Sequence, residues 1–120
     1  RKGKLDSTSD NTYATDTHYL IEIKADKQPI GNYEKMVPFT LHEIELQTGD
    51  ALYSFTDGFA DQFGGNFGKK LKSKPLKELL LSIQQYTMSE QLILVDKAYI
   101  DWKREYEQID DVCMIGVAIF

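Results

Sequence analysis

The chain has 120 residues, enough for one domain with a modest core, and its 42% hydrophobic and 12% aromatic content is typical of a folded protein. Its 14 basic and 19 acidic residues give a net charge of −5, which argues against the broad basic surface of a nucleic-acid-binding protein. No apolar stretch approaches the roughly 20 residues that cross a bilayer, and residues 1–5 lack the apolar core of a signal peptide. We therefore expect a cytoplasmic segment without membrane contact.

The N-terminal region differs in composition from the rest of the chain. Ser, Thr, Asp and Asn dominate residues 6–17, and their side chains compete for backbone hydrogen bonds and favour turns. We therefore predict a flexible N-terminal segment over residues 1–17 and a folded part over residues 18–120.

Three strand-like runs come next in the chain. Residues 18–24 have the composition of a strand of mixed burial, and the Gln-Pro-Ile-Gly sequence at 28–31 predicts a tight bend after it. Residues 39–46 alternate apolar and polar side chains, residues 47–50 are typical of a turn, and residues 51–56 form another apolar run. This order predicts an antiparallel hairpin between the second and third runs.

A glycine-rich stretch, residues 59–68, follows and predicts a loop. Beyond it, Pro75 suits the first turn of a helix, and one face of that helix would carry Leu76, Leu79, Leu80 and Ile83. Residues 87–90 have capping-box spacing, and the helix after them would carry a stripe of Leu92, Val95, Tyr99 and Trp102. No convergent polar groups accompany these stripes, so they indicate core packing rather than a cofactor pocket. The expected fold class is α+β, an antiparallel sheet covered by two helices.

Cys113 is the only cysteine, so an internal disulfide is impossible. It lies in the apolar run 112–120, which predicts a final strand. A reactive thiolate needs an electropositive, partly exposed setting. We therefore predict a buried thiol rather than a nucleophile.

Two dipeptides that contain aspartate, which we call the acidic pairs, border the apolar runs. The first, Asp57-Gly58, follows residues 51–56, and the second, Asp110-Asp111, precedes the final strand. A carboxylate beside a hydrophobic strand is costly to desolvate unless a cation or hydrogen bonds compensate it, so the two pairs suggest one shared cation site. Asp-Gly is also typical of a hairpin turn, although no strand resumes after Gly58 at hairpin spacing. If they bind no cation, Asp110 and Asp111 belong to a solvated loop ahead of the final strand. The nearby Asp61 is most simply interpreted as a solvated surface charge.

The chemistry of these candidates favours a hard cation. Oxygen ligands suit Mg²⁺ or Mn²⁺, whereas neither His18 nor His42 has a His or Cys partner at zinc-ligand spacing. The calcium-binding EF-hand pattern is absent at Asp57. The sequence therefore predicts a magnesium or manganese site.

Four short motifs occur in a fixed order: Gln-Pro-Ile-Gly at 28–31, Tyr-Ser-Phe-Thr-Asp-Gly-Phe-Ala-Asp at 53–61, Phe-Gly-Lys at 67–69 and Gln-Ile-Asp-Asp-Val at 108–112. In this order they resemble the C-terminal half of bacterial SpoIIE-type phosphatases, which are similar to the metal-dependent type 2C protein serine/threonine phosphatases. The resemblance implies that the chain is part of an α-β-β-α sandwich whose complete form carries a dinuclear Mn²⁺ or Mg²⁺ site.

Carried over by position, the resemblance implies that Asp57 and Asp110 are metal ligands and that Gly58 and Asp111 support the site. Water activated by the ions would attack phosphorus, so no catalytic protein nucleophile is implied. Lys69 and Lys70 could steer a phosphate, with a solvated lysine run as the alternative. The implied partners are a phosphoprotein substrate, among regulators of sigma-factor control, and the upstream half and sensor domains of the same chain.

The chain departs from the family pattern in one respect. No aspartate with a Gly-His-Gly type turn precedes Asp57, so we expect an incomplete metal centre and little phosphatase activity from this segment alone. A non-catalytic protein-interaction or assembly module with a phosphatase-like fold is the alternative. An unpaired sheet edge and an uncovered apolar face in such a fragment favour self-association into a homo-oligomer.

Overall fold

The computed structural model describes residues 12–120. Its elements, in chain order, are β1 (Thr12–Ala14), β2 (Tyr19–Ile21), β3 (Ala51–Phe55), α1 (Gly58–Asp61), β4 (Phe63–Gly64), β5 (Lys69–Lys70), α2 (Ser73–Ser82), α3 (Met88–Lys103) and β6 (Met114–Ala118). Most of the predicted flexible segment 1–17 lies outside the described residues, and the part within them contains strand β1, which pairs antiparallel with β2. Mixed α+β architecture with antiparallel strands confirms the expected fold class.

Strand β3 pairs antiparallel with the final strand β6, with Leu52 opposite Val117 and Tyr53 opposite Gly116. The predicted hairpin between residues 39–46 and 51–56 is therefore wrong. The apolar positions of 39–46 change face partway along the run, whereas β6 offers a continuous apolar run. Gly116 also leaves room for the Tyr53 ring, which lies 3.2 Å from where a Cβ would be.

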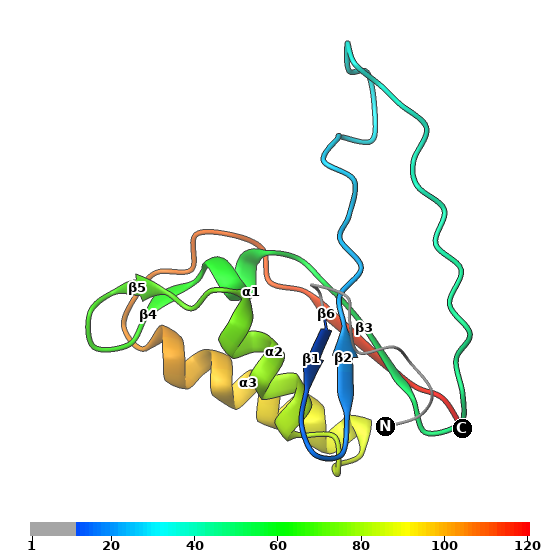
Figure 1. Cartoon of the computed structure of the whole chain (residues 1–120). Helices are drawn as coiled ribbons and strands as arrows, with labels where there is room; N and C mark the ends of the chain where they lie inside the picture. Colours follow the sequence, from blue (N-terminus) through cyan, green and yellow to red (C-terminus); the bar gives the residue numbers. More distant parts are fainter. Residues whose placement is uncertain (1–11) are drawn as a thin grey trace.

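Residues 22–50, all of which the structure describes, form no strand and project away from the helices as one long excursion (Figure 1). Side-chain hydrogen bonds connect its two limbs: the Asp26 carboxylate accepts bonds from the Thr40 amide and hydroxyl, and Gln28 exchanges two bonds with the Val37 backbone. The bonds from Thr40 hold the pKa of Asp26 below its usual value. Many apolar side chains of the excursion are exposed, including Ile30, Val37 and Leu41.

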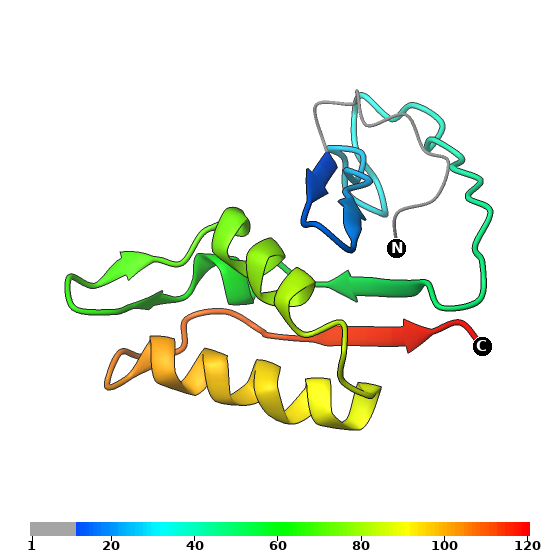
Figure 2. The same ribbon diagram turned by 60° about the horizontal axis from the view of Figure 1, so that its bottom comes forward.

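The core lies where helices α1, α2 and α3 meet. Phe59, Leu76 and Tyr99 are buried together, and the rings of Phe59 and Tyr99 make an edge contact with centroids 5.1 Å apart. Helix α3 packs against β6, and α2 contacts both α1 and β2 (Figure 2). The two predicted helices are thus confirmed, but Leu92 is 70% exposed and does not belong to the packed face. Among residues 12–120, no helix combines the length and apolar character needed to cross a membrane.

A buried lysine connects the β1–β2 hairpin to helix α2. The Lys77 ammonium lies 2.8 Å from the Glu22 carboxylate and 4.6 Å from the centre of the Tyr13 ring. Burial acts to lower the pKa of Lys77, but the hydrogen bond and charge of Glu22 outweigh burial, and the pKa is raised. This cation therefore stays charged and paired.

Cys113 is exposed, which corrects the predicted buried thiol. The reason is the alternation of side chains along extended backbone: Val112 and Met114 pack against the core, so the residue between them faces the opposite side. An apolar sequence neighbourhood did not reveal this face.

The predicted capping box at the start of α3 is present. The Thr87 hydroxyl accepts a bond from the Glu90 amide, and the Glu90 carboxylate accepts one from the Thr87 amide, which lowers the pKa of Glu90. We expect Thr87→Ala to cost about 1 kcal/mol of stability in thermal or denaturant unfolding. Ser89→Ala, at an exposed position in the same turn, should change stability by less than about 0.5 kcal/mol. Equal effects from the two changes would contradict this account.

The same carboxylate gives the cap a pH dependence. Because the pKa of Glu90 is lower in the folded chain than in the unfolded chain, its stabilising contribution is present above its ordinary pKa and is lost as the pH falls through the lowered value.

Candidate functional site

Thr56 connects the end of β3 to the start of the final strand. Its amide donates to the Cys113 carbonyl (3.0 Å), and its hydroxyl accepts a bond from the Cys113 amide (3.0 Å) and donates to the Asp111 carbonyl (2.8 Å). The strand pairing therefore continues one step beyond β3, to the residue immediately before Asp57. This geometry places the two acidic segments next to each other.

Gly58 makes the closest approach between these segments. A Cβ built on Gly58 would lie 2.2 Å from the Asp111 carbonyl oxygen and 3.1 Å from a methyl group of Val112. Helix α1 thus begins directly against the backbone of Asp111, and only glycine permits that contact. Support of a metal site by Gly58 stays a prediction.

Asp57 precedes α1 as its N-terminal capping residue, but its side chain makes no capping hydrogen bond to the described backbone. Its carboxylate is exposed, as are those of Asp110 and Asp111. One carboxylate oxygen of Asp110 accepts a bond from the Asp111 amide (2.7 Å), and the Asp110 carbonyl accepts one from the Gln108 side chain (3.0 Å). The structure brings the backbones of the two acidic pairs together, while metal ligation by Asp57 and Asp110 stays a prediction.

The candidate ligands have the right chemistry for a hard cation, but there are too few of them for a complete site. Carboxylate oxygens of Asp57 and Asp110 are the ligands that Mg²⁺ and Mn²⁺ take. Over residues 12–120, however, no group of three or more His, Cys, Asp and Glu side chains is placed to hold a metal ion. These residues could therefore supply part of a metal site, and other ligands would have to complete it.

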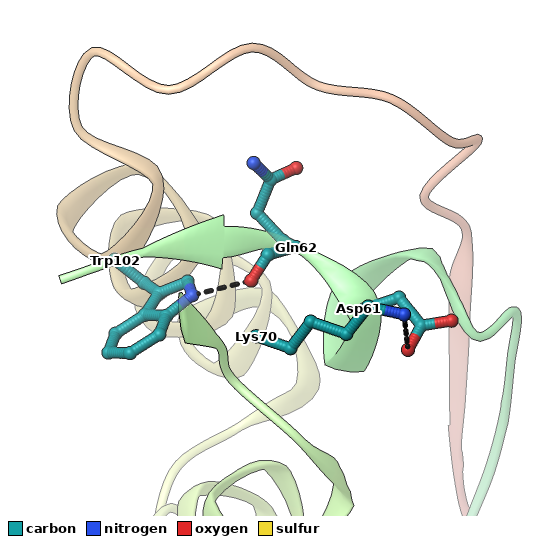
Figure 3. A network of polar contacts seen from close by, with 4 residues as sticks. All are labelled: Asp61, Gln62, Lys70 and Trp102. Carbon is teal, nitrogen blue, oxygen red and sulfur yellow. Dashed lines mark hydrogen bonds and ion pairs between the residues drawn. The ribbon is translucent and has the colours of Figure 1, made fainter. Parts of the chain in front are cut away.

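Asp61 and Lys70 face each other rather than the acidic pairs. Their side chains form an ion pair of 3.2 Å (Figure 3). The Lys70 ammonium also lies 5.8 Å from the centre of the Phe63 ring. Both side chains are exposed, so the pair contributes little to stability. The surface-charge interpretation of Asp61 fits this arrangement. Lys70 is engaged in this ion pair, and Lys69, its neighbour on β5, is also exposed.

The glycine-rich stretch 59–68, predicted to be a loop, contains most of helix α1, strand β4 and the turn that leads to β5, so the loop prediction is wrong. Gly64 lies so close to α3 that a Cβ there would be 2.0 Å from the Trp102 carbonyl oxygen. The Trp102 indole N–H donates to the Gln62 carbonyl at 2.8 Å (Figure 3). Gly64 and its neighbour Gly65 therefore allow close packing against Trp102 of α3. Composition alone did not distinguish glycines needed for close packing from glycines of a flexible loop.

Sequence reasoning also missed Gln62, the residue after α1. It is 1% exposed, and all of its polar atoms are hydrogen-bonded within the described chain. The available signal was a glutamine two residues before a Gly-Gly pair and next to an aromatic residue, which does not distinguish a buried amide from a surface amide.

Comparisons with known proteins identify a family and a similar fold. The family model described as Stage II sporulation protein E (SpoIIE) matches residues 12–120. Among solved structures, the SiaA-PP2C domain of Pseudomonas aeruginosa is similar, with a TM-score of 0.64 and 26% sequence identity. That match covers 69% of this chain and 34% of the other, so the matched region spans about a third of the length of that relative. The comparison with curated proteins finds no match.

Proposed function

The chain belongs to the SpoIIE family, and on that premise we propose that it is the C-terminal part of a metal-dependent phosphatase domain acting on phosphoserine and phosphothreonine in bacterial signalling. The observation that carries this proposal is the contact of Gly58 with the Asp111 backbone, which places the two acidic pairs side by side. The similarity to the SiaA-PP2C domain supports the same phosphatase class.

In this proposal Asp57 and Asp110 hold Mn²⁺ or Mg²⁺, and Gly58 and Asp111 set the spacing between them. When bound, a pair of such ions supplies Lewis acidity toward the phosphoryl oxygens and makes water acidic enough to serve as the nucleophile. Thr56 fixes the Asp111 carbonyl, and Gly58 allows α1 to start against it. The residues of this chain therefore orient carboxylates and form no covalent bond to substrate.

The remaining ligands would come from another part of the domain, since the described residues do not complete a metal group. We propose the upstream half as their source, a phosphoprotein as substrate and sensor domains as regulatory partners. We also propose a cytoplasmic location, and self-association through the exposed apolar side chains of residues 22–50 when this segment is alone.

Reconstitution tests the proposed activity. The chain, a polypeptide carrying the upstream half, and their mixture are each assayed with a phosphoserine peptide and Mn²⁺. We expect phosphate release from the mixture or the intact domain, its loss with a chelator, and little release from the chain alone. An intact domain without metal-dependent release would contradict the proposal.

A second candidate is a non-catalytic interaction module that keeps the phosphatase fold. The incomplete metal group among residues 12–120 and the exposed apolar excursion favour it. The same experiment separates the two, because a module of this kind would bind a partner protein while its intact domain released no phosphate.

A further inference from the structure

Gln62 is a buried polar connection between three parts of the fold. Its side-chain oxygen accepts a bond from the Tyr99 hydroxyl of α3 at 2.7 Å. Its side-chain nitrogen donates to the carbonyls of Phe63 (2.9 Å) and Glu107 (3.0 Å). Its own carbonyl accepts bonds from the Trp102 indole and the Leu71 amide. A single residue thus connects the end of α1, helix α3 and the loop before β6.

The contacts of Gln62 fix the orientation of its amide. Backbone carbonyls can only accept, so the group facing Phe63 and Glu107 must be the NH₂, and the oxygen must face Tyr99. The side chain extends away from Trp102, on the side where the loop after α3 passes (Figure 3). Neither a carboxylate nor an apolar side chain could satisfy these three partners together.

Two hydrogen bonds hold the loop between α3 and β6 on either side of Asp110, and both come from the segment that carries Asp57. Gln62 binds the carbonyl of Glu107, and Thr56 binds the carbonyl of Asp111. Asp110 lies between these anchors, three residues after one and one residue before the other. The position of Asp110 relative to Asp57 therefore depends on both hydrogen bonds.

We propose that Gln62 is a positioning residue that holds the Asp110 loop in place beside Asp57 through the Glu107 carbonyl. The inference rests on the proposed function insofar as Asp110 is a metal ligand. Gln62 touches neither acidic side chain in any hydrogen bond of the described chain, so it acts through the loop backbone.

The test compares two buried glutamines in the complete domain. Gln62→Met keeps the side-chain length and removes every side-chain hydrogen bond. The control, Gln91→Met, does the same to a residue that is 4% exposed and bonds to Tyr53 and the Tyr86 carbonyl near the start of α3. Both variants lose stability, but only Gln62→Met frees the Glu107 carbonyl.

Amide hydrogen exchange of peptides covering residues 107–111 is the first measurement. We expect exchange about tenfold faster in Gln62→Met and unchanged in Gln91→Met, because one anchoring bond no longer opposes local opening. Equal exchange in the two variants would overturn the proposal. The measurement needs neither metal nor activity, so its outcome is independent of the proposed function.

Activation by Mn²⁺ is the second measurement. Partners that orient metal ligands typically change metal affinity by about 10–100-fold, so the Mn²⁺ concentration for half-activation should rise by that factor in Gln62→Met and stay constant in Gln91→Met. An unchanged value in Gln62→Met would overturn the positioning role. A wild-type domain without any Mn²⁺-dependent activity would overturn the proposed function instead.

Two further observations keep the proposal testable if Gln62→Met does not fold. Tyr99→Phe removes the bond to the Gln62 oxygen but leaves the bond to Glu107, so it should lower stability and keep wild-type exchange at residues 107–111. In the unmodified domain, the Gln62 side-chain amide protons should show nuclear Overhauser contacts to residues 107 and 108. Their absence would count against the proposal.

Discussion

Asp57→Asn should reduce the Mn²⁺-dependent phosphatase activity of the complete domain by more than about 100-fold, since even the partners that orient metal ligands typically account for about 10–100-fold. The substitution keeps the size of the side chain and removes the negative charge that a divalent cation needs. Asp57 is exposed and makes no capping bond to the described backbone, so thermal stability should change little. Activity against a phosphoserine peptide and the melting temperature are measured together, and only the activity should fall.

Asp61→Asn is the matched control. Asp61 lies four residues further on, in helix α1, and pairs with Lys70 at the surface. Its loss should leave activity within about twofold of wild type, since an exposed pair contributes little. Similar losses of activity from both substitutions would show that the charge of the whole segment, rather than Asp57 in particular, matters.

Gly58→Ala should disturb both stability and activity. The added methyl group would lie 2.2 Å from the Asp111 carbonyl oxygen, whereas real Cβ atoms essentially never come closer than 3.0 Å. Backbone must therefore move, at a cost of about 1–3 kcal/mol for overpacking. A displacement of roughly 1 Å at a catalytic constellation can cost about 100-fold in rate. Chemical denaturation and phosphate release from the complete domain measure the two effects.

Gly116→Ala provides the comparison for Gly58. There the nearest atoms are the Met88 sulfur and the Tyr53 ring, both 3.2 Å away and both on side chains that can shift by a few tenths of an ångström. Stability should change by less than about 1 kcal/mol, and activity should be retained. If Gly116→Ala were as damaging as Gly58→Ala, the contact with the Asp111 backbone would have no special role.

Helices α2 and α3 and their starting points could be predicted because their signals are local. The capping box at Thr87 and Glu90 needs only four residues, and the spacing of Leu76 and Leu80 is set by the period of one helix. The backbone contact between the segments of Gly58 and Asp111 could be predicted as well, although less directly, because one segment follows an apolar strand, the other precedes one, and the family motifs occur in order.

The partner of β3 could not be predicted, because pairing between distant segments leaves no local pattern. Residues 39–46 alternate apolar and polar side chains, with one change of face, and precede a turn, yet β3 pairs with a strand about 60 residues further on. The exposure of Cys113 depends on which face of that strand packs on the core, and this face is set by the same pairing. The role of Gln62 depends on carbonyls that only the folded loop presents.

Crystallography of the complete domain with Mn²⁺, using the anomalous signal of the metal, tests the central claim most directly. The account predicts bound Mn²⁺ within about 2.2 Å of carboxylate oxygens from both Asp57 and Asp110. Ions bound elsewhere, or coordinated by only one of these two residues, would contradict it.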